Sequence, residues 1–240
     1  MENIRIDKFL SQVMNISRID AKKLMRSGVV LLNGAVCKDA ATKVNCLNDT
    51  VVVNGKHLAY NKYIYIMMNK PDGVVSASND PKEKTVVDLV PDHLKRRGLF
   101  PAGRLDKDST GFVLLTDDGD FAHRILAPGK HVPKTYEVTL QRAVFDDEIA
   151  ELASGPVLDN EKLQPVEVTL IDDDIHLYSV ILREGRYHQI KRMFAKQGNL
   201  VLSLHRVQIG GLALDDTLLP GLCRELSDTE VDMIIQNIGK

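Results

Sequence analysis

The sequence predicts an α+β protein in which a small amino-terminal domain precedes a larger domain with a mainly antiparallel sheet flanked by helices. Short strands joined by tight turns dominate the chain, helices are interspersed among them, and the polar segment AYNKY at residues 59–63 separates two regions. A length of 240 residues suits one small and one medium domain. We therefore place the domains at residues 1–58 and 59–240.

The amino-terminal region has a helix–helix–hairpin pattern. Residues 5–14 carry apolar side chains at helical spacing. Ser17 is placed as the N-cap of a second helix, which ends at Gly28. The pairs Asn33-Gly34 and Asn54-Gly55 each predict a type I′ turn between two short strands.

The larger region alternates strands and helices. Its strands are predicted from apolar runs that end at turn residues, at 63–75, 134–141, 165–171, 175–185 and 199–211. Its helices are predicted from apolar periodicity and from Gly or capping residues at their ends, at 146–155, 186–198 and 228–238. Ser227 with Glu230 forms a capping box for the last helix.

The net charge of −2 conceals an uneven distribution. Residues 1–45 hold eight Lys and Arg against four Asp and Glu, and residues 183–206 hold six against one. The rest of the chain is therefore strongly acidic. Two basic segments on an acidic body suggest a polyanionic partner. A single segment of this kind is better explained as solvated surface, whereas the two together are equally consistent with either explanation.

Composition excludes several other classes. The chain lacks an apolar run of about 18 residues and an apolar amino-terminal core, so neither a membrane span nor a signal peptide is expected. Its three cysteines are scattered and form no C-x-x-C pair, which argues against disulfides and a zinc site. We expect a cytoplasmic protein without a metal.

The stretch GRLDKDSTGFVLLTDDG at residues 103–119 can be compared with three motifs. As a calcium loop it places Asp117 where a bidentate Glu is needed, and the preceding Pro and Gly exclude the entering helix. As the Asp-x-Asp-x-Thr loop of a phosphatase, Asp106 would attack phosphorus and Asp108 would move a proton. That loop follows an apolar strand, whereas GRL precedes Asp106 here, so the phosphatase is a minor alternative.

The third comparison extends along the chain. The same stretch closely resembles the G-R-L-D signature of pseudouridine synthases, KTYEV at 134–138 resembles their tyrosine motif, and EGRYHQIKRM at 184–193 resembles their third motif. The motifs occur in the order of that family. Residues 184–211 are most similar to the RsuA family, the branch that modifies small-subunit ribosomal RNA and carries an amino-terminal S4 domain.

The resemblance implies an enzyme that isomerises a specific uridine of 16S rRNA to pseudouridine. Asp106 would be the catalytic carboxylate, acting on the ribose of a flipped-out nucleotide. Tyr136 would stack on the base, and Lys191 would pair with Asp106 and keep it ionised. Isomerisation involves no redox change, so no cofactor is expected.

Further substrate contacts follow from the same resemblance. Arg104 would fill the gap left by the base or hold a phosphate, and Ile190 would pack beneath the uracil. A hydrogen-bonded structural role suits His188 better than a proton shuttle. The basic residues around the third motif would hold the RNA backbone, and they are Arg186, His188, Arg192, Lys196 and Arg206.

The first 55 to 60 residues resemble the S4 RNA-binding domain, with two short helices, an Asn-Gly hairpin and cations on the second helix. Flexible cations on one small face release counterions when they meet a nucleic-acid backbone. The residues expected to face phosphates are Arg5, Lys8, Arg18, Lys22, Lys23 and Arg26.

We expect a monomer whose partner is ribosomal RNA, either small-subunit rRNA or an assembling small subunit. Two alternatives stay open. The first is a synthase that modifies large-subunit rRNA. The second is a non-catalytic RNA-binding protein, which would be expected to lose Asp106, Tyr136 or Lys191, and all three are present.

Overall fold

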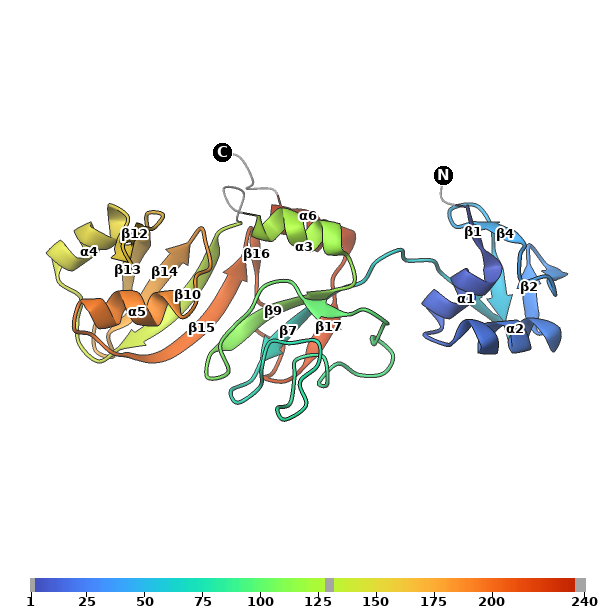
Figure 1. Cartoon of the computed structure of the whole chain (residues 1–240), viewed down its shortest axis with the longest axis horizontal. Helices are drawn as coiled ribbons and strands as arrows, with labels where there is room; N and C mark the ends of the chain where they lie inside the picture. Colours follow the sequence, from blue (N-terminus) through green and yellow to red (C-terminus); the bar gives the residue numbers. More distant parts are fainter. Residues whose placement is uncertain (1–2, 128–131, 236–240) are drawn as a thin grey trace. The chain divides into compact units, whose positions relative to one another are not determined.

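The structure is a computed structural model that describes residues 3–127 and 132–235, and it divides into two compact units (Figure 1). The first unit runs to Ile64 and includes Lys95–Gly98, and the second begins at Tyr65 and contains the remaining residues. Both units combine helices with mainly antiparallel strands, so the predicted α+β class is confirmed.

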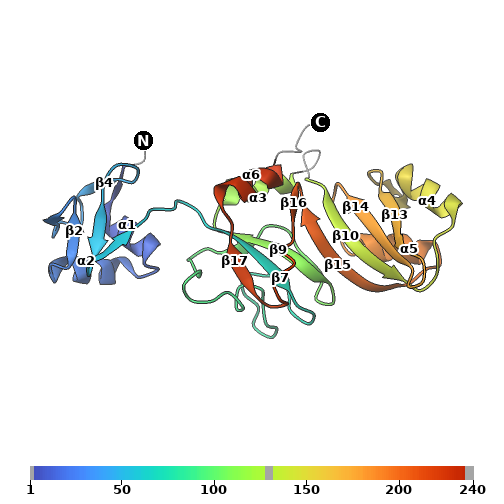
Figure 2. The same cartoon turned by 180° about the vertical axis from the view of Figure 1, so that it is seen from behind.

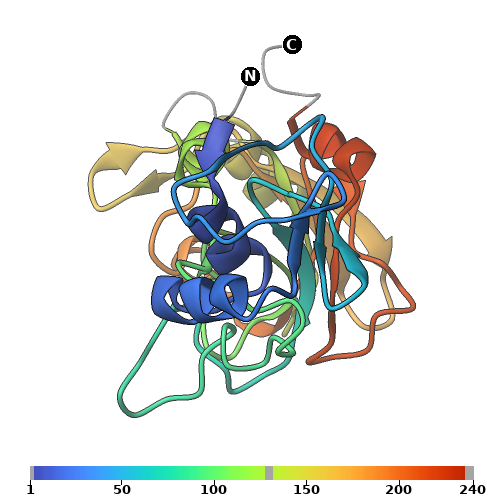
Figure 3. The ribbon, with the colours of Figure 1, turned by 90° about the vertical axis from the view of Figure 1, so that its right-hand side faces the viewer.

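The first unit packs two helices beside two small sheets. Figure 3 shows the helices α1 and α2 side by side in blue. Strands β1 and β4 form one sheet, and the other has the order β3-β2-β5-β6. The elements are α1 Ile6–Val13, α2 Arg18–Arg26, β1 Asn3–Arg5, β2 Val30–Leu32, β3 Ala35–Val36, β4 Lys43–Asn45, β5 Val51–Val53 and β6 Lys56–Leu58.

Local capping and turn residues explain these boundaries. The Ser17 side chain accepts a hydrogen bond from the Asp20 N–H at 3.1 Å, which confirms it as the N-cap of α2. Gly28 ends the same helix with φ +78°. Both residues of the Asn33-Gly34 and Asn54-Gly55 pairs have positive φ, as the predicted type I′ turns require.

The second unit is built on a nine-stranded sheet. The order along its main path is β13-β14-β10-β15-β9-β7-β17, with β16 beside β15 and β8 beside β9. All pairs are antiparallel except β9 with β15. The strands are β7 Tyr65–Lys70, β8 Phe100–Pro101, β9 Thr110–Thr116, β10 Lys134–Leu140, β13 Glu167–Asp172, β14 Leu177–Leu182, β15 Val201–Ile209, β16 Leu212–Ala213 and β17 Cys223–Glu225.

Two pairs of helices lie against different halves of this sheet (Figures 1 and 2). Helices α3 (Gly119–Leu126) and α6 (Asp228–Ile235) pack with β7 and β9, and Phe121 and Ile234 are buried in the resulting core. Helices α4 (Asp146–Ala153) and α5 (Gln189–Lys196) lie against the half formed by β13, β14, β10 and β15. A small hairpin, β11 (Val157–Leu158) and β12 (Glu161–Lys162), follows α4.

The observed helices differ from the predicted ones at two places. The helix predicted from residue 186 begins only at Gln189, because His188 has φ +47° and the Gln189 side chain instead accepts the Arg186 N–H at 3.0 Å. Helix α3 is not among the predicted helices. The predicted end of the last helix, after residue 235, lies outside the described residues.

The close approach of β15 to β9 requires a glycine at position 111. We therefore predict that a larger residue there destabilises the fold. A Cβ at Gly111 would lie 2.4 Å from the Arg206 carbonyl oxygen, and its φ is +100°. We expect Gly111→Ala to lower the free energy of unfolding by about 3 kcal/mol, from overpacking plus left-handed strain. Gly73→Ala is the control, since it has φ +78° but open space around the new Cβ. Equal losses in urea unfolding would contradict the steric cause.

Candidate active site

The three predicted motifs meet around one cavity of about 770 Å³ in the second unit. The loop before β9 contributes Arg104 and Asp106, β10 contributes Tyr136, and the start of α5 contributes Ile190 and Lys191. These segments are distant in sequence, and the sheet order brings them together because β10 and β9 both border β15. The sequence-predicted catalytic residues therefore share one site.

A buried lysine and a buried serine fix the backbone around Asp106. Lys70 is fully buried at the end of β7 and donates to the carbonyl oxygens of Lys107 and Ser109 at 3.0 and 2.6 Å, and to that of Pro71 at 3.1 Å. The Ser76 hydroxyl both donates to and accepts from the Leu105 backbone, at 2.9 and 3.0 Å. Neither anchoring residue is among the predicted site residues, although a lysine that ends the apolar strand YIYIMMNK is a visible signal.

The Asp106 carboxylate lies between two basic side chains. Its Oδ2 atom is 3.7 Å from the Lys191 Nζ, and its Oδ1 atom is 3.4 Å from the His188 Nε2. The Lys191 Nζ is closer to Asp108, at 2.5 Å from its Oδ1. That hydrogen bond from Lys191 holds the pKa of Asp108 below its usual value. Lys191 thus contacts two carboxylates, of which the resemblance implied only Asp106.

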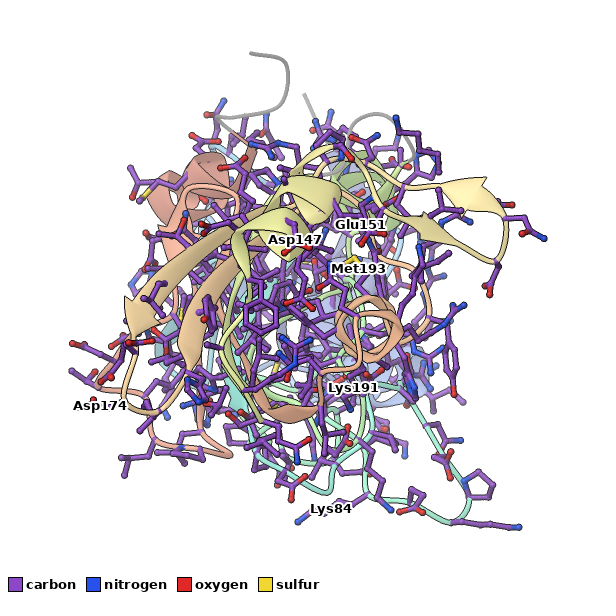
Figure 4. The ribbon with its side chains drawn as sticks, turned by 90° about the vertical axis from the view of Figure 1, so that its left-hand side faces the viewer. Lys84, Asp147, Glu151, Asp174, Lys191 and Met193 are labelled. Atoms are coloured by element: carbon purple, nitrogen blue, oxygen red, sulfur yellow. The ribbon has the colours of Figure 1, made fainter. Side chains whose placement is uncertain are left out.

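Helix α5 places the Lys191 side chain on its partly exposed side, away from the core. Figure 4 shows Lys191 and Met193 leaving opposite sides of this helix, as residues two positions apart do. Met193 and Ile190 are buried, whereas Lys191 is partly exposed. Packing of the apolar side therefore fixes the rotation of α5 and with it the position of the Lys191 ammonium group.

Tyr136 is buried and lines the cavity from β10. Its cross-strand partner on β15 is Arg206, whose guanidinium carbon lies 5.9 Å from the centre of the tyrosine ring. The prediction that Arg206 grips the RNA backbone is wrong, because the residue is 1% exposed and its Nε donates to the Phe112 carbonyl oxygen at 2.7 Å. Burial follows from the close approach of β15 to Gly111.

Other predicted substrate residues surround the cavity. Arg104 is exposed at its edge, and Ile190 is buried in its wall. Arg186 lines it as well and pairs with Glu161 at 2.9 Å. Two further cations of this group also have acidic partners, Arg192 with Asp159 and Lys196 with Glu151.

Three of the predicted RNA-binding cations of the first unit line one surface hollow. Arg5, Lys22 and Arg26 line it together with Lys38, which is not one of the predicted RNA-binding residues. Arg5 also pairs with the buried Asp7 at 3.0 Å. Lys23 pairs with Asp20 at 3.1 Å, and Arg18 is exposed on the same helix. Lys8 is half-buried on α1.

Residues 3–127 and 132–235 contain no evident metal site. No group of three or more His, Cys, Asp or Glu residues is arranged there to hold a metal ion. Within the same ranges, the helices are too short or too polar to cross a bilayer.

A mainly antiparallel α+β unit that holds the three motifs around one carboxylate defines the class of pseudouridine synthases, and comparison with known proteins agrees. Residues 64–196 match the RNA pseudouridylate synthase family, and residues 4–51 match the S4 domain. The chain belongs to the RNA pseudouridylate synthase family. It is an RNA pseudouridine synthase with an amino-terminal S4 domain.

Several relatives match the chain over nearly its whole length. It is 41% identical to the uncharacterized RNA pseudouridine synthase YtzG of Bacillus subtilis, over 96% of this chain and 98% of the relative. It is 42% identical to ribosomal small subunit pseudouridine synthase A of Salmonella typhimurium, over 95% and 98%. The Escherichia coli protein of that name is 40% identical, over 97% and 100%. A crystal structure of a pseudouridylate synthase has a TM-score of 0.67 at 36% identity, over 97% and 100%.

Proposed function

We propose that this protein isomerises uridine 516 of 16S rRNA to pseudouridine, with Asp106 as the catalytic carboxylate. The observation that supports the chemistry is the position of Asp106 in the cavity, between Lys191 and His188 and in the same cavity lining as Tyr136. The small-subunit target is supported by the relatives named as ribosomal small subunit pseudouridine synthase A.

The chemistry begins when the uridine leaves its stack, at a cost of about a few kcal/mol. The base then enters the cavity and stacks on Tyr136, with Ile190 beneath it. The Asp106 carboxylate acts on the ribose, by attack at C1′ or by proton removal. Lys191 and His188 orient that carboxylate, and Arg104 at the edge of the cavity takes the place of the flipped base or holds a phosphate.

The first unit serves as an RNA anchor in this proposal. Its cations, including the group of Arg5, Lys22, Arg26 and Lys38 around one hollow, would contribute a largely sequence-independent attraction to phosphates. Arg186, Arg192 and Lys196 would add phosphate contacts beside the cavity. Each of these three is held by an acidic residue that a phosphate would have to replace.

The anchor predicts a change in salt dependence. Lys22→Gln or Arg26→Gln should weaken rRNA binding and reduce the slope of log affinity against log salt by about 0.9 for each phosphate that the variant no longer neutralises. Lys56→Gln is the matched control, because Lys56 is exposed on β6 of the same unit but does not line the hollow. Equal slopes for all three variants, measured by filter binding across a salt series, would contradict the anchor.

Mapping of pseudouridine tests the target. A strain that lacks the gene should lose one pseudouridine in 16S rRNA, and the purified protein should restore it in an unmodified transcript. Loss of a site in large-subunit rRNA instead would favour the large-subunit alternative. Loss of no site, together with normal RNA binding, would favour the non-catalytic alternative.

A further inference from the structure

Three buried cations lie on strands β7, β15 and β10 of the large sheet in the second unit. Lys70 on β7 is paired with Gly111 on β9, Gly111 with Arg206 on β15, and Arg206 with Tyr136 on β10. Lys134 lies two residues before Tyr136, and the alternating burial of β10 places both on the same face. Lys70, Arg206 and Lys134 are 0%, 1% and 5% exposed, so their charges are poorly solvated by bulk water.

The three cations differ in how fully they are hydrogen-bonded. Lys70 uses all three of its donors on backbone carbonyls. Among the residues that the structure describes, Lys134 makes one hydrogen bond, to the Val132 carbonyl oxygen at 3.2 Å. Arg206 uses its Nε, but its buried Nη2 has no acceptor among the described residues. Buried donors are normally satisfied, so Lys134 and Arg206 have hydrogen-bonding capacity left over.

Neither residue has an acidic partner in the part of the chain that the structure describes. Within residues 3–127 and 132–235, no carboxylate oxygen is in ion-pair contact with Lys134 or Arg206. Both residues line the cavity that holds Asp106, whereas Lys70 does not. A buried cation without an anion is unfavourable, so a structural role alone is a poor explanation for the pair.

We propose that Lys134 and Arg206 are catalytic residues that donate hydrogen bonds to the uracil oxygens and stabilise the negative charge that the base carries during isomerisation. This inference rests on the proposed function, which places the uridine in this cavity. Donors aimed at a charge that develops in the transition state are among the strongest sources of rate enhancement.

The isomerisation places negative charge on the uracil, which nearby cations would stabilise. The N1–C1′ bond breaks and leaves its electron pair on the base, where the charge spreads over N1, O2 and O4. The base then turns, C5 forms the new bond to C1′, the C5 hydrogen leaves as a proton, and N1 gains a proton. Atoms and electrons balance without a redox partner. Routes that begin with addition of Asp106 to the base or with proton loss from the ribose also place negative charge on the uracil.

The protein maintains this arrangement at a cost in stability. Burial, with a contribution from the charge of Arg206, lowers the pKa of Lys134 to about 8. A lysine whose folded pKa lies below its unfolded value destabilises the fold at lower pH, and the penalty is relieved as pH rises through about 8 towards 10.5. An apolar residue of similar length at this position should therefore stabilise the protein at neutral pH, and the gain should shrink at pH 10.

The test compares Lys134→Met with Lys84→Met, a control in the same unit whose lysine is exposed and does not line the cavity. Each variant is measured for urea unfolding at pH 7 and pH 10, for affinity to unmodified 16S and 23S rRNA transcripts, and for the single-turnover rate of pseudouridine formation at saturating enzyme. Lys134→Met should be at least as stable as the wild type at pH 7 and bind RNA equally well. Its single-turnover rate should fall by about 10²-fold or more. The control should keep the wild-type rate.

Two variants of Arg206 provide a second test of the proposal. Arg206→Lys keeps the charge but removes the guanidinium donors, so it should lose less rate than Arg206→Met. A Lys134→Met protein with the wild-type rate, or one that loses stability or fails to fold, would overturn the proposal by assigning the residue to structure. Wild-type activity only on the 23S transcript would refute the proposed 16S target, while the comparison of variants would still decide the role of Lys134.

Discussion

Asp106→Asn should yield a folded protein that binds rRNA and forms no detectable pseudouridine. The substitution keeps the shape of the side chain and removes the negative charge and the nucleophilic oxygen. The backbone anchors from Lys70 and Ser76 do not involve the side chain, so the loop should keep its conformation. Loss of a group on which a covalent mechanism depends costs about 10⁴-fold or more in turnover.

The matched control for this variant is Asp174→Asn. Asp174 is exposed at the turn between β13 and β14, away from α5 in Figure 4. It should have wild-type single-turnover kinetics. Product from Asp106→Asn protein, verified by mass spectrometry to be free of deamidation, would refute the assignment of Asp106. Loss of RNA binding together with activity would instead assign the carboxylate to substrate positioning.

Turns and caps could be predicted from the sequence because their determinants lie within a few residues of one another. The Asn33-Gly34 turn has both φ angles positive, as expected. The predicted capping box also forms, since the Ser227 N–H donates to the Glu230 Oε2 at 2.8 Å and the Ser227 hydroxyl accepts from the Glu230 N–H at 3.4 Å. Such interactions need no knowledge of the rest of the fold.

The errors lie where one residue has two possible roles. In the sequence Asp118 belongs to the motif loop, but its side chain accepts the Phe121 N–H at 3.0 Å and so begins the unpredicted helix α3. Arg206 resembles a surface cation because its neighbours in the sequence are basic. Its burial depends on the pairing of β15 with β9 and β10, which a sequence pattern does not reveal.

For the candidate site, the sequence predicts which residues come together but not the distances between them. The order of the motifs predicts that Asp106, Tyr136 and Lys191 belong together, and they line one cavity. The sequence does not predict that Lys191 lies closer to Asp108 than to Asp106, because both carboxylates are on one tight loop. The buried state of Lys70 and Lys134 also depends on the whole sheet.

Lys191→Met should lower the single-turnover rate by about 10²-fold while rRNA affinity stays within about twofold of the wild type. We infer that the Lys191 ammonium group, 3.7 Å from the Asp106 carboxylate, orients that carboxylate and stabilises its negative charge. Lys191→Arg should keep part of the activity, because the charge survives with a different geometry. Lys84→Met is the control, because it removes an exposed cation that does not line the cavity.

Asp108→Asn decides which of the two carboxylates matters to Lys191. If Lys191 acts through Asp106, removal of the Asp108 charge leaves the ammonium group with Asp106 alone, and the single-turnover rate should stay near the wild-type value. If Asp108 is the functional partner, Asp108→Asn and Lys191→Met should be equally slow, and the double variant should be no slower than either. A third outcome, in which Lys191→Met weakens binding and shallows the salt slope while chemistry on bound RNA is intact, would make Lys191 a phosphate contact and remove it from the mechanism.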